Sequence, residues 1–251
     1  MLVVVLWILL CSVLGVLWFQ PRWAWRGLAP FICPGAVYFG STQAKVVALT
    51  IDDGPDDRSA VHPNTTQAIL SVLAQYDAHA TFFLIGSRIT PENRHWVAEM
   101  VGQGHEVGNH FMTDAASGQL PLPEFESQIR DTERMILEAA GPQDQKIQLR
   151  WLRPGGGFCD RTRVDIAQRL GYQVAIGSKW PFDTLIPFSK FAAAHILTCL
   201  EPGTIVILHD HGKDGEWGER TVQTLATILP ILDRKGFKVV TLSQLFNLEV
   251  D

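Results

Sequence analysis

Seven short runs rich in β-branched and aromatic residues alternate with longer amphipathic stretches, and this alternation limits the folds open to the chain more than any other feature. Such runs are typical of buried parallel strands joined by helices. The predicted strands are 45–51, 80–85, 105–109, 149–153, 172–176, 204–208 and 237–241. The predicted helices are 64–76, 91–104, 123–141, 160–171, 189–200 and 219–236. The pattern implies right-handed crossovers in either a barrel or an open doubly wound sheet.

Capping residues mark the ends of two of these helices. Thr90 is the expected N-cap of the second helix, with Pro91 as its first residue. In the fourth helix, Asp160 is the expected N-cap and Gly171 the stop. These signals predict the helix boundaries more sharply than hydrophobic periodicity does.

Several classes of protein are excluded by the sequence. No predicted strand is followed by a GxGxxG or P-loop sequence, so a nucleotide-binding sheet has no support. The net charge is −5 and no basic stripe exists, which argues against a nucleic-acid partner. The four cysteines lack CxxC spacing, which excludes a zinc knuckle, while a single disulfide stays possible.

Unusual polar residues occur at or just after the carboxyl ends of the predicted strands. They are Asp52 with Asp53, His110 with Asp114, Arg153, Asp183, and His209 with Asp210. In β/α barrels the loops at this end of the strands converge over a packed interior and carry the chemistry. The predicted fold class is therefore α/β, an incomplete or distorted (β/α)7 barrel preceded by one hydrophobic N-terminal helix.

Each of these polar groups also has a structural explanation when it is taken alone. An Asp-Asp-Gly sequence after a strand is often a turn, a lone histidine is often a hydrogen-bonded structural residue, and an arginine can form a surface ion pair. Five such groups on one rim make a functional site the better interpretation.

The chemistry that this set permits is metal-assisted hydrolysis. Asp53, His110 and Asp114 offer oxygen and nitrogen ligands to one divalent ion and leave a position open for water. Asp52 is then placed to act as a base towards that water, and His209 as an acid towards the leaving group. The ion would polarise the carbonyl and lower the pKa of the water.

Short motifs at these positions resemble those of the polysaccharide deacetylases of carbohydrate esterase family 4, which include chitin and peptidoglycan deacetylases. The motifs read TIDDG at 50–54, GNHFMTD at 108–114, RPGGG at 153–157, WPFD at 180–183 and LHD at 208–210. The resemblance covers about residues 45–245, and it implies the incomplete barrel. The second and fourth motifs depart from the usual family form.

The resemblance implies Asp52 as the catalytic base and Asp53 and His110 as metal ligands. Asp114 stands where the family usually has a second histidine, which makes the site harder and more negative. Zinc remains the first expectation, with manganese, cobalt or magnesium less disfavoured than usual. A metal ion held by this more anionic ligand set is a weaker Lewis acid, so we expect a slower enzyme than is usual for the family.

The remaining motifs imply further roles in the site. Arg153 would orient Asp52, and a backbone N–H near Gly156 would help to bind the oxyanion. Asp183 would hold the acid, which the match identifies as His209 rather than the neighbouring His211. Trp180 and Leu208 would line the pocket for the acetyl group.

The expected activity is hydrolysis of N-acetyl groups on an N-acetylated glycan, with release of acetate. One alternative keeps the metal and the barrel but acts on a small amide, an O-acetyl ester or a cyclic imide. Another is a catalytically weak glycan binder in which Asp114 marks lost metal affinity. No obligate protein partner is evident.

Residues 2–19 contain no charge and are long enough to cross a bilayer. We expect 1–26 to be an uncleaved signal-anchor or a cleaved signal, 27–44 a linker and 45–251 the catalytic domain. The protein is thus predicted to be membrane-anchored or secreted, with an extracytoplasmic catalytic domain. Arg22 and Arg26 follow the apolar segment, and the positive-inside rule would favour the opposite orientation.

Overall fold

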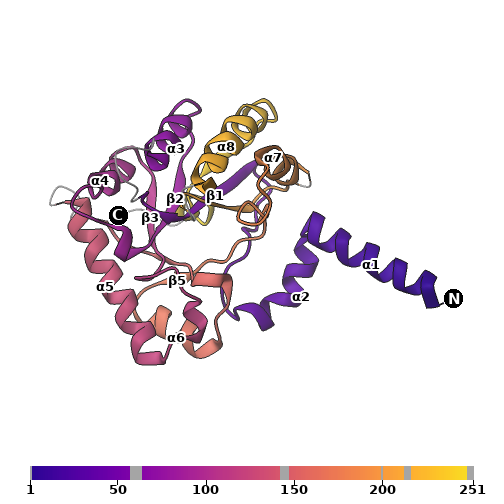
Figure 1. Ribbon diagram of the computed structural model, residues 1–251, viewed down its shortest axis with the longest axis horizontal. Coiled ribbons are helices and arrows are strands. Elements are labelled where there is room, and N and C mark those ends of the chain that lie inside the picture. Colours follow the sequence, from indigo (N-terminus) through magenta and orange to yellow (C-terminus); the bar gives the residue numbers. More distant parts are fainter. Residues whose placement is uncertain (1, 57–63, 142–146, 199, 212–215, 248–251) are drawn as a thin grey trace.

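The computed structural model describes residues 2–56, 64–141, 147–198, 200–211 and 216–247. Parallel strands form one curled sheet with helices packed around it, as Figure 1 shows. The strands are β1 (Val46–Gly54), β2 (Ala80–Leu84), β3 (Glu106–Asn109), β4 (Trp151–Leu152), β5 (Gln173–Val174), β6 (Ile205–His209) and β7 (Lys238–Val240). Each overlaps a predicted strand, so the alternation in the sequence identified the sheet.

The strands follow the order β5-β4-β3-β2-β1-β6, and β7 pairs with β1 as well. β7 contacts the first residues of β1, from Val46 to Ala48, whereas β2 pairs with β1 from Leu49 onwards. Between β5 and β6 the described residues form only single bridges, Val37 to Ala175, Phe39 to Thr204 and Lys179 to Val206. The predicted incomplete barrel is confirmed.

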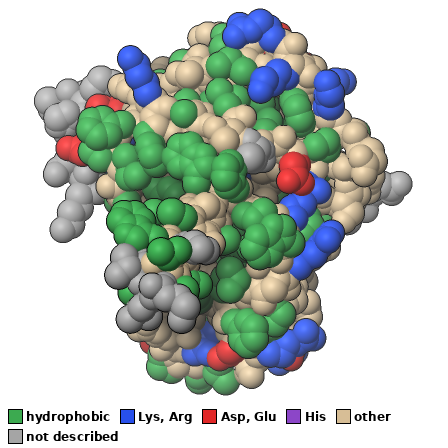
Figure 2. Space-filling model, turned by 90° about the vertical axis from the view of Figure 1, so that its right-hand side faces the viewer, with side chains coloured by type: hydrophobic (Ala, Val, Ile, Leu, Met, Phe, Trp, Pro, Cys, Tyr) green, Lys and Arg blue, Asp and Glu red, His purple; other side chains and the backbone are tan. Residues whose placement is uncertain are grey.

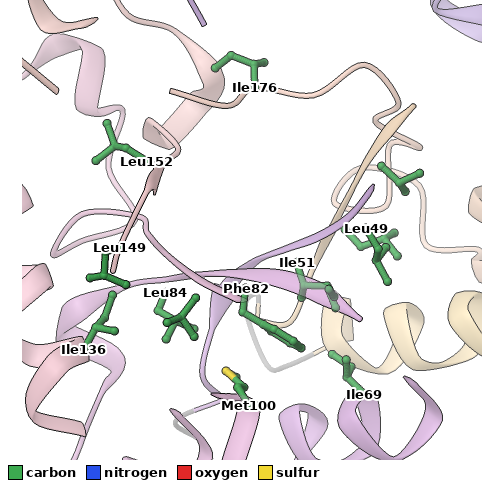
Figure 3. Close-up of a cluster of buried hydrophobic side chains, with 14 of the residues drawn as sticks. Leu49, Ile51, Ile69, Phe82, Leu84, Met100, Ile136, Leu149, Leu152 and Ile176 are labelled. Atoms are coloured by element: carbon green, nitrogen blue, oxygen red, sulfur yellow. The ribbon is translucent and has the colours of Figure 1, made fainter. Parts of the chain in front are cut away.

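Six of the helices that surround the sheet overlap the six predicted ones. They are α3 (Thr65–Ala74), α4 (His95–Gly102), α5 (Leu122–Ala140), α6 (Arg161–Arg169), α7 (Ser189–Leu197) and α8 (Glu216–Arg234). The short α9 (Leu242–Leu245) was not predicted. The main core lies between strands and helices (Figure 3), where Ile51 and Phe82 of the sheet meet Ile69 and Met100 of the helices. Burying each such side chain contributes about 1.5–3 kcal/mol.

One predicted helix boundary is wrong and another is confirmed. α4 begins at His95, not at Pro91, because residues 90–94 form a turn in which the amide of Thr90 donates to the side chain of Asn93. Asp160 caps α6 as predicted, and its carboxylate accepts from the amide of Arg163.

Two helices precede the sheet. α1 (Leu2–Phe19) extends away from the barrel, and α2 (Arg22–Ile32) returns along it (Figure 1). Within the described residues, no single helix meets a length and apolarity criterion for a membrane span, whereas Val4–Phe19 and Arg22–Ile32 meet it together across a bend of 89°. The chain from 37 to 39, in the predicted linker, forms bridges with Ala175 and Thr204.

Candidate active site

A cavity of about 680 Å³ opens at the carboxyl ends of the strands. Its lining includes the predicted residues Asp52, Asp53, His110, Asp114, Arg153, Gly156, Trp180 and His209. The sequence reasoning therefore places this set correctly on one rim. Asp183 is buried behind His209 and supports the cavity from outside it.

Asp52 and Asp53 both face this cavity although neighbouring residues of a strand normally point to opposite faces. The register of β1 against β2 shifts between Asp52 and Gly54, which makes Asp53 an extra, bulged residue. Asp53 also adopts a left-handed backbone conformation with φ of 70°. Bulges of this kind re-aim side chains next to functional sites, and here the bulge brings two carboxylates to one pocket.

Arg153 holds Asp52 in place. Its Nη1 donates to Asp52 Oδ1 at 2.5 Å and to Thr50 Oγ1 at 2.7 Å, while Nε donates to the carbonyl of Ala175 at 3.0 Å. The guanidinium also lies 4.2 Å from the ring centre of Phe83. Both charged side chains are almost fully buried, so the pair is fixed and Asp52 has a permanent counter-ion.

His209, the last residue of β6, is paired with Asp183. Their Nδ1 and Oδ2 atoms lie 2.9 Å apart, which leaves His209 Nε2 as the ring nitrogen free to act in the cavity. Burial by itself would lower the pKa of His209, but Asp183, with Asp53 and Asp52 further away, raises it to about 10. His209 is therefore an imidazolium at neutral pH and carries a proton that it can donate.

His110 and Asp53 form a pair that fits a bound cation. His110 Nδ1 lies 2.7 Å from the carbonyl of Arg153, and a carbonyl only accepts, so Nδ1 carries a hydrogen. Nε2 then faces Asp53 Oδ1 at 3.4 Å, which sets two electron-rich atoms against each other unless a proton or a metal ion lies between them. The donor types, one imidazole and one carboxylate, suit a divalent metal.

Asp114 is not brought to this pair. Its side chain is about half exposed, and Oδ2 lies 3.4 Å from Nη2 of Arg88. The other nitrogen of Arg88, Nη1, donates to the backbone carbonyl of Asp53 at 2.6 Å. In the described parts of the chain no three His, Cys, Asp or Glu side chains are arranged to hold a metal ion, so Asp114 does not act as the predicted third ligand in this arrangement.

The sequence reasoning missed Arg88. It lies in the turn η1 (Gly86–Arg88), three residues beyond the end of the predicted strand 80–85. Like Asp52, His110 and His209, Arg88 is a polar residue that follows the end of a predicted strand. That position was the signal that could have identified it. The guanidinium of Arg88 places a positive charge between Asp114 and the backbone of Asp53.

Three residues named in the sequence analysis lie away from the cavity. Leu208 was expected to line the pocket, but it is fully buried in the core, because Ile207 and His209 alternate with it and take the cavity side of β6. Asp210 accepts hydrogen bonds from the hydroxyls of Thr65 and Thr66. His211 faces Asp56 at 3.9 Å.

The chain is an α/β-barrel protein, and two histidine–aspartate pairs, His110–Asp53 and His209–Asp183, lie at the strand ends. This arrangement is typical of the active site of a hydrolase. The family model for polysaccharide deacetylase matches residues 39–175, more than half of the sequence. A curated relative, the peptidoglycan-N-acetylglucosamine deacetylase of Bacillus cereus, is 34% identical over 212 residues, which cover 81% of this chain and 89% of the relative. The chain belongs to the polysaccharide deacetylase family.

Solved structures of the same fold include both active and inactive proteins. A family 4 acetyl xylan esterase from Clostridium thermocellum, in complex with a cobalt ion, superposes with a TM-score of 0.70 at 29% identity and covers 82% of this chain and 94% of its own. A family 4 pseudoenzyme from Bacillus anthracis has a TM-score of 0.72 at 26% identity and covers 86% and 70%. The fold alone therefore does not decide whether a member is active.

Proposed function

We propose that the protein is a metal-dependent deacetylase that hydrolyses the N-acetyl groups of an N-acetylated glycan and releases acetate. The observation that carries this proposal is the pair of buried ion pairs, Arg153–Asp52 and Asp183–His209, whose residues Asp52 and His209 lie side by side on β1 and β6 and line one cavity. One pair fixes a carboxylate that can accept a proton, and the other fixes an imidazolium that can donate one. A chitin- or peptidoglycan-like glycan fits the activity in the name of the Bacillus cereus relative.

The two pairs divide the work of the reaction. Asp52 accepts a proton from the attacking water, and Arg153 keeps the carboxylate oriented while it does so. His209 Nε2 gives its proton to the amide nitrogen as the C–N bond breaks, and Asp183 stabilises the imidazolium before the transfer. Gly156 and Gly157 line the same cavity, and a backbone N–H of this loop would support the oxyanion.

Asp53 and His110 would hold the metal, with Asp114 as a third ligand once it leaves Arg88. When bound, the ion would polarise the acetyl carbonyl and acidify the water. Zinc is the first choice for this donor set, with manganese, cobalt and magnesium as alternatives because two of the three ligands are carboxylates. Cobalt is the ion in the related esterase structure.

Acetate release from chitotetraose, combined with metal analysis of the purified protein, tests the proposal. Asp52→Asn should reduce turnover about a thousandfold, the scale of general base catalysis, and leave metal bound, because Asp52 is not one of the predicted ligands. Asp165→Asn, a change at a half-exposed aspartate paired with Arg161, is the matched control and should keep full activity. Full activity in Asp52→Asn would eliminate this carboxylate as the base.

A glycan-binding protein without activity is the second candidate, and one specific observation favours it. Asp114 pairs with Arg88 instead of joining Asp53 and His110, and a relative of the same fold is a pseudoenzyme. Metal that binds without acetate release would support an activity on another acyl substrate. Neither metal nor acetate would support the binding protein.

A further inference from the structure

The N-terminal segment forms one wall of the active-site cavity. Seven of its residues line the same cavity as Asp52 and His209, and six of the seven are apolar: Val16, Leu17, Ala24, Trp25, Leu28 and Ile32, together with Gln20. A polymer that runs through an open groove would have to pass this wall. The cavity is therefore closed on one side by side chains that suit an apolar ligand.

Specific hydrogen bonds attach this wall to the loop that carries Asp183. The side chain of Gln20 donates to the carbonyl of Trp180 at 2.8 Å and accepts from its amide at 2.9 Å. Trp25 Nε1 donates to the carbonyl of Ser178 at 2.9 Å, and Lys179 Nζ donates to the carbonyl of Phe19 at 3.1 Å. These hydrogen bonds fix the N-terminal segment to the active-site loop, so the segment is a structural part of the site.

Beyond the wall, α1 exposes apolar side chains in every direction. Val4, Leu6, Trp7, Leu9, Leu10, Val13 and Leu14 are each about half exposed or more. A second copy of the chain would cover one stripe of such a helix, whereas lipid covers all of it. Its 18 residues span about 27 Å, slightly less than the roughly 30 Å of a bilayer's hydrocarbon core, and α1 meets the criterion for a membrane span only together with α2.

α2 lies nearly at right angles to α1 and has the character of an interfacial helix. Ala24 faces the domain, while Trp23 and Phe31 are 67% and 85% exposed. Figure 2 shows the face of the molecule towards which α1 extends, with apolar side chains across its centre and Lys and Arg side chains towards its edge. A membrane that holds α1 would bring this face, and the mouth of the cavity with it, to the lipid surface.

We propose that the cavity takes an N-acetylated sugar attached to a membrane lipid, with the lipid chain lying against the wall formed by α1 and α2. This inference rests on the proposed deacetylase function and narrows its substrate class. The sugar presents its N-acetyl group to Asp52 and His209, while Leu17 and Leu28 contact the first methylenes of the chain. A free polysaccharide offers this wall only the C–H faces of its rings and its acetyl methyl groups, which are much smaller apolar surfaces than an alkyl chain.

The experiment compares three probes with the full-length protein in detergent micelles: dodecyl β-N-acetylglucosaminide, its methyl analogue and chitotetraose. Acetate release should show a kcat/KM at least tenfold higher for the dodecyl than for the methyl glycoside. A tenfold effect requires burial of only about two methylenes. Leu28→Gln should reduce the dodecyl-to-methyl ratio about tenfold, and the ratio cancels any general loss of active enzyme.

Leu137→Gln is the matched control, because Leu137 is a similarly exposed helical leucine on α5 that does not line the cavity. Because the Leu137→Gln protein is assayed in the same micelles, it also controls for the enrichment of the dodecyl glycoside in detergent. Equal kcat/KM values for the two glycosides, or an unchanged dodecyl-to-methyl ratio in Leu28→Gln, would overturn the lipid proposal. Acetate release from chitotetraose in the same experiment would still support the deacetylase function. Failure to release acetate from all three probes would overturn both.

Discussion

Replacement of Asp183 by asparagine should remove the charge that keeps His209 protonated while leaving the shape of the site unchanged. Asp183 Oδ2 lies 2.9 Å from His209 Nδ1, and Asp183 is 1% exposed. Asparagine has the same size and can still accept the Nδ1–H hydrogen bond through its amide oxygen. What disappears is the negative charge beside a buried imidazolium.

The magnitude follows from the distance. Unit charges about 4 Å apart interact with about 4 kcal/mol at an effective dielectric constant of 20, or roughly three pKa units. Burial opposes the charge on His209, so without Asp183 its pKa should fall from about 10 to near or below its ordinary value of 6.5. A cation beside Asp53 would lower the pKa in both proteins, and the difference between them would remain.

The assay is the pH dependence of kcat for acetate release, measured for both proteins between pH 5 and pH 10. Because the acid must be protonated, activity is lost as pH rises through its pKa, and this alkaline limb should move down by two units or more in Asp183→Asn. NMR titration of the His209 ring gives the same shift without turnover. A limb that stays in place while activity falls would refute the assignment of His209 as an acid tuned by Asp183.

Three further changes test other parts of the site. Arg153→Met leaves Asp52 buried without its counter-ion, so the free energy of unfolding should fall by about 3–5 kcal/mol in urea denaturation. Burial, and then the nearby Asp56, raise the pKa of Asp210 from its ordinary value of 3.8 to about 6, so its ionisation reduces stability as pH rises from about 4 to about 6, and the full loss is present above that range. Asp210→Asn should therefore be more stable than wild type at pH 8 by roughly 1–3 kcal/mol but not at pH 4, and equal differences at the two pH values would refute this. Arg88→Met should tighten zinc binding to the metal-free protein about tenfold in calorimetry, and weaker binding would show that Arg88 supports the site.

The sequence predicted the sheet and the rim of the cavity because both depend on local patterns. Buried parallel strands are apolar throughout, and polar side chains at their carboxyl ends converge for topological reasons, so Asp52, His110, Arg153 and His209 meet. The bulge at Asp53 was not predictable, since strand alternation alone sends Asp53 to the other face. Contacts between distant segments, such as Gln20 with Trp180, leave no periodic signal.

Two carboxylates of the cavity are paired with arginines, and the difference between the pairs decides which carboxylate a metal can recruit. Asp52 and Arg153 are both nearly fully buried, and separating them would leave a buried charge without a counter-ion, at a cost of about 3–5 kcal/mol. Asp114 is 55% exposed and lies 3.4 Å from Arg88, a geometry that contributes only about 0–1 kcal/mol. Binding of a divalent ion at Asp53 and His110 would easily exceed that, and it would also repel the guanidinium. Asp114 is thus the carboxylate free to change partner, and Asp52 stays beside Arg153 to accept a proton.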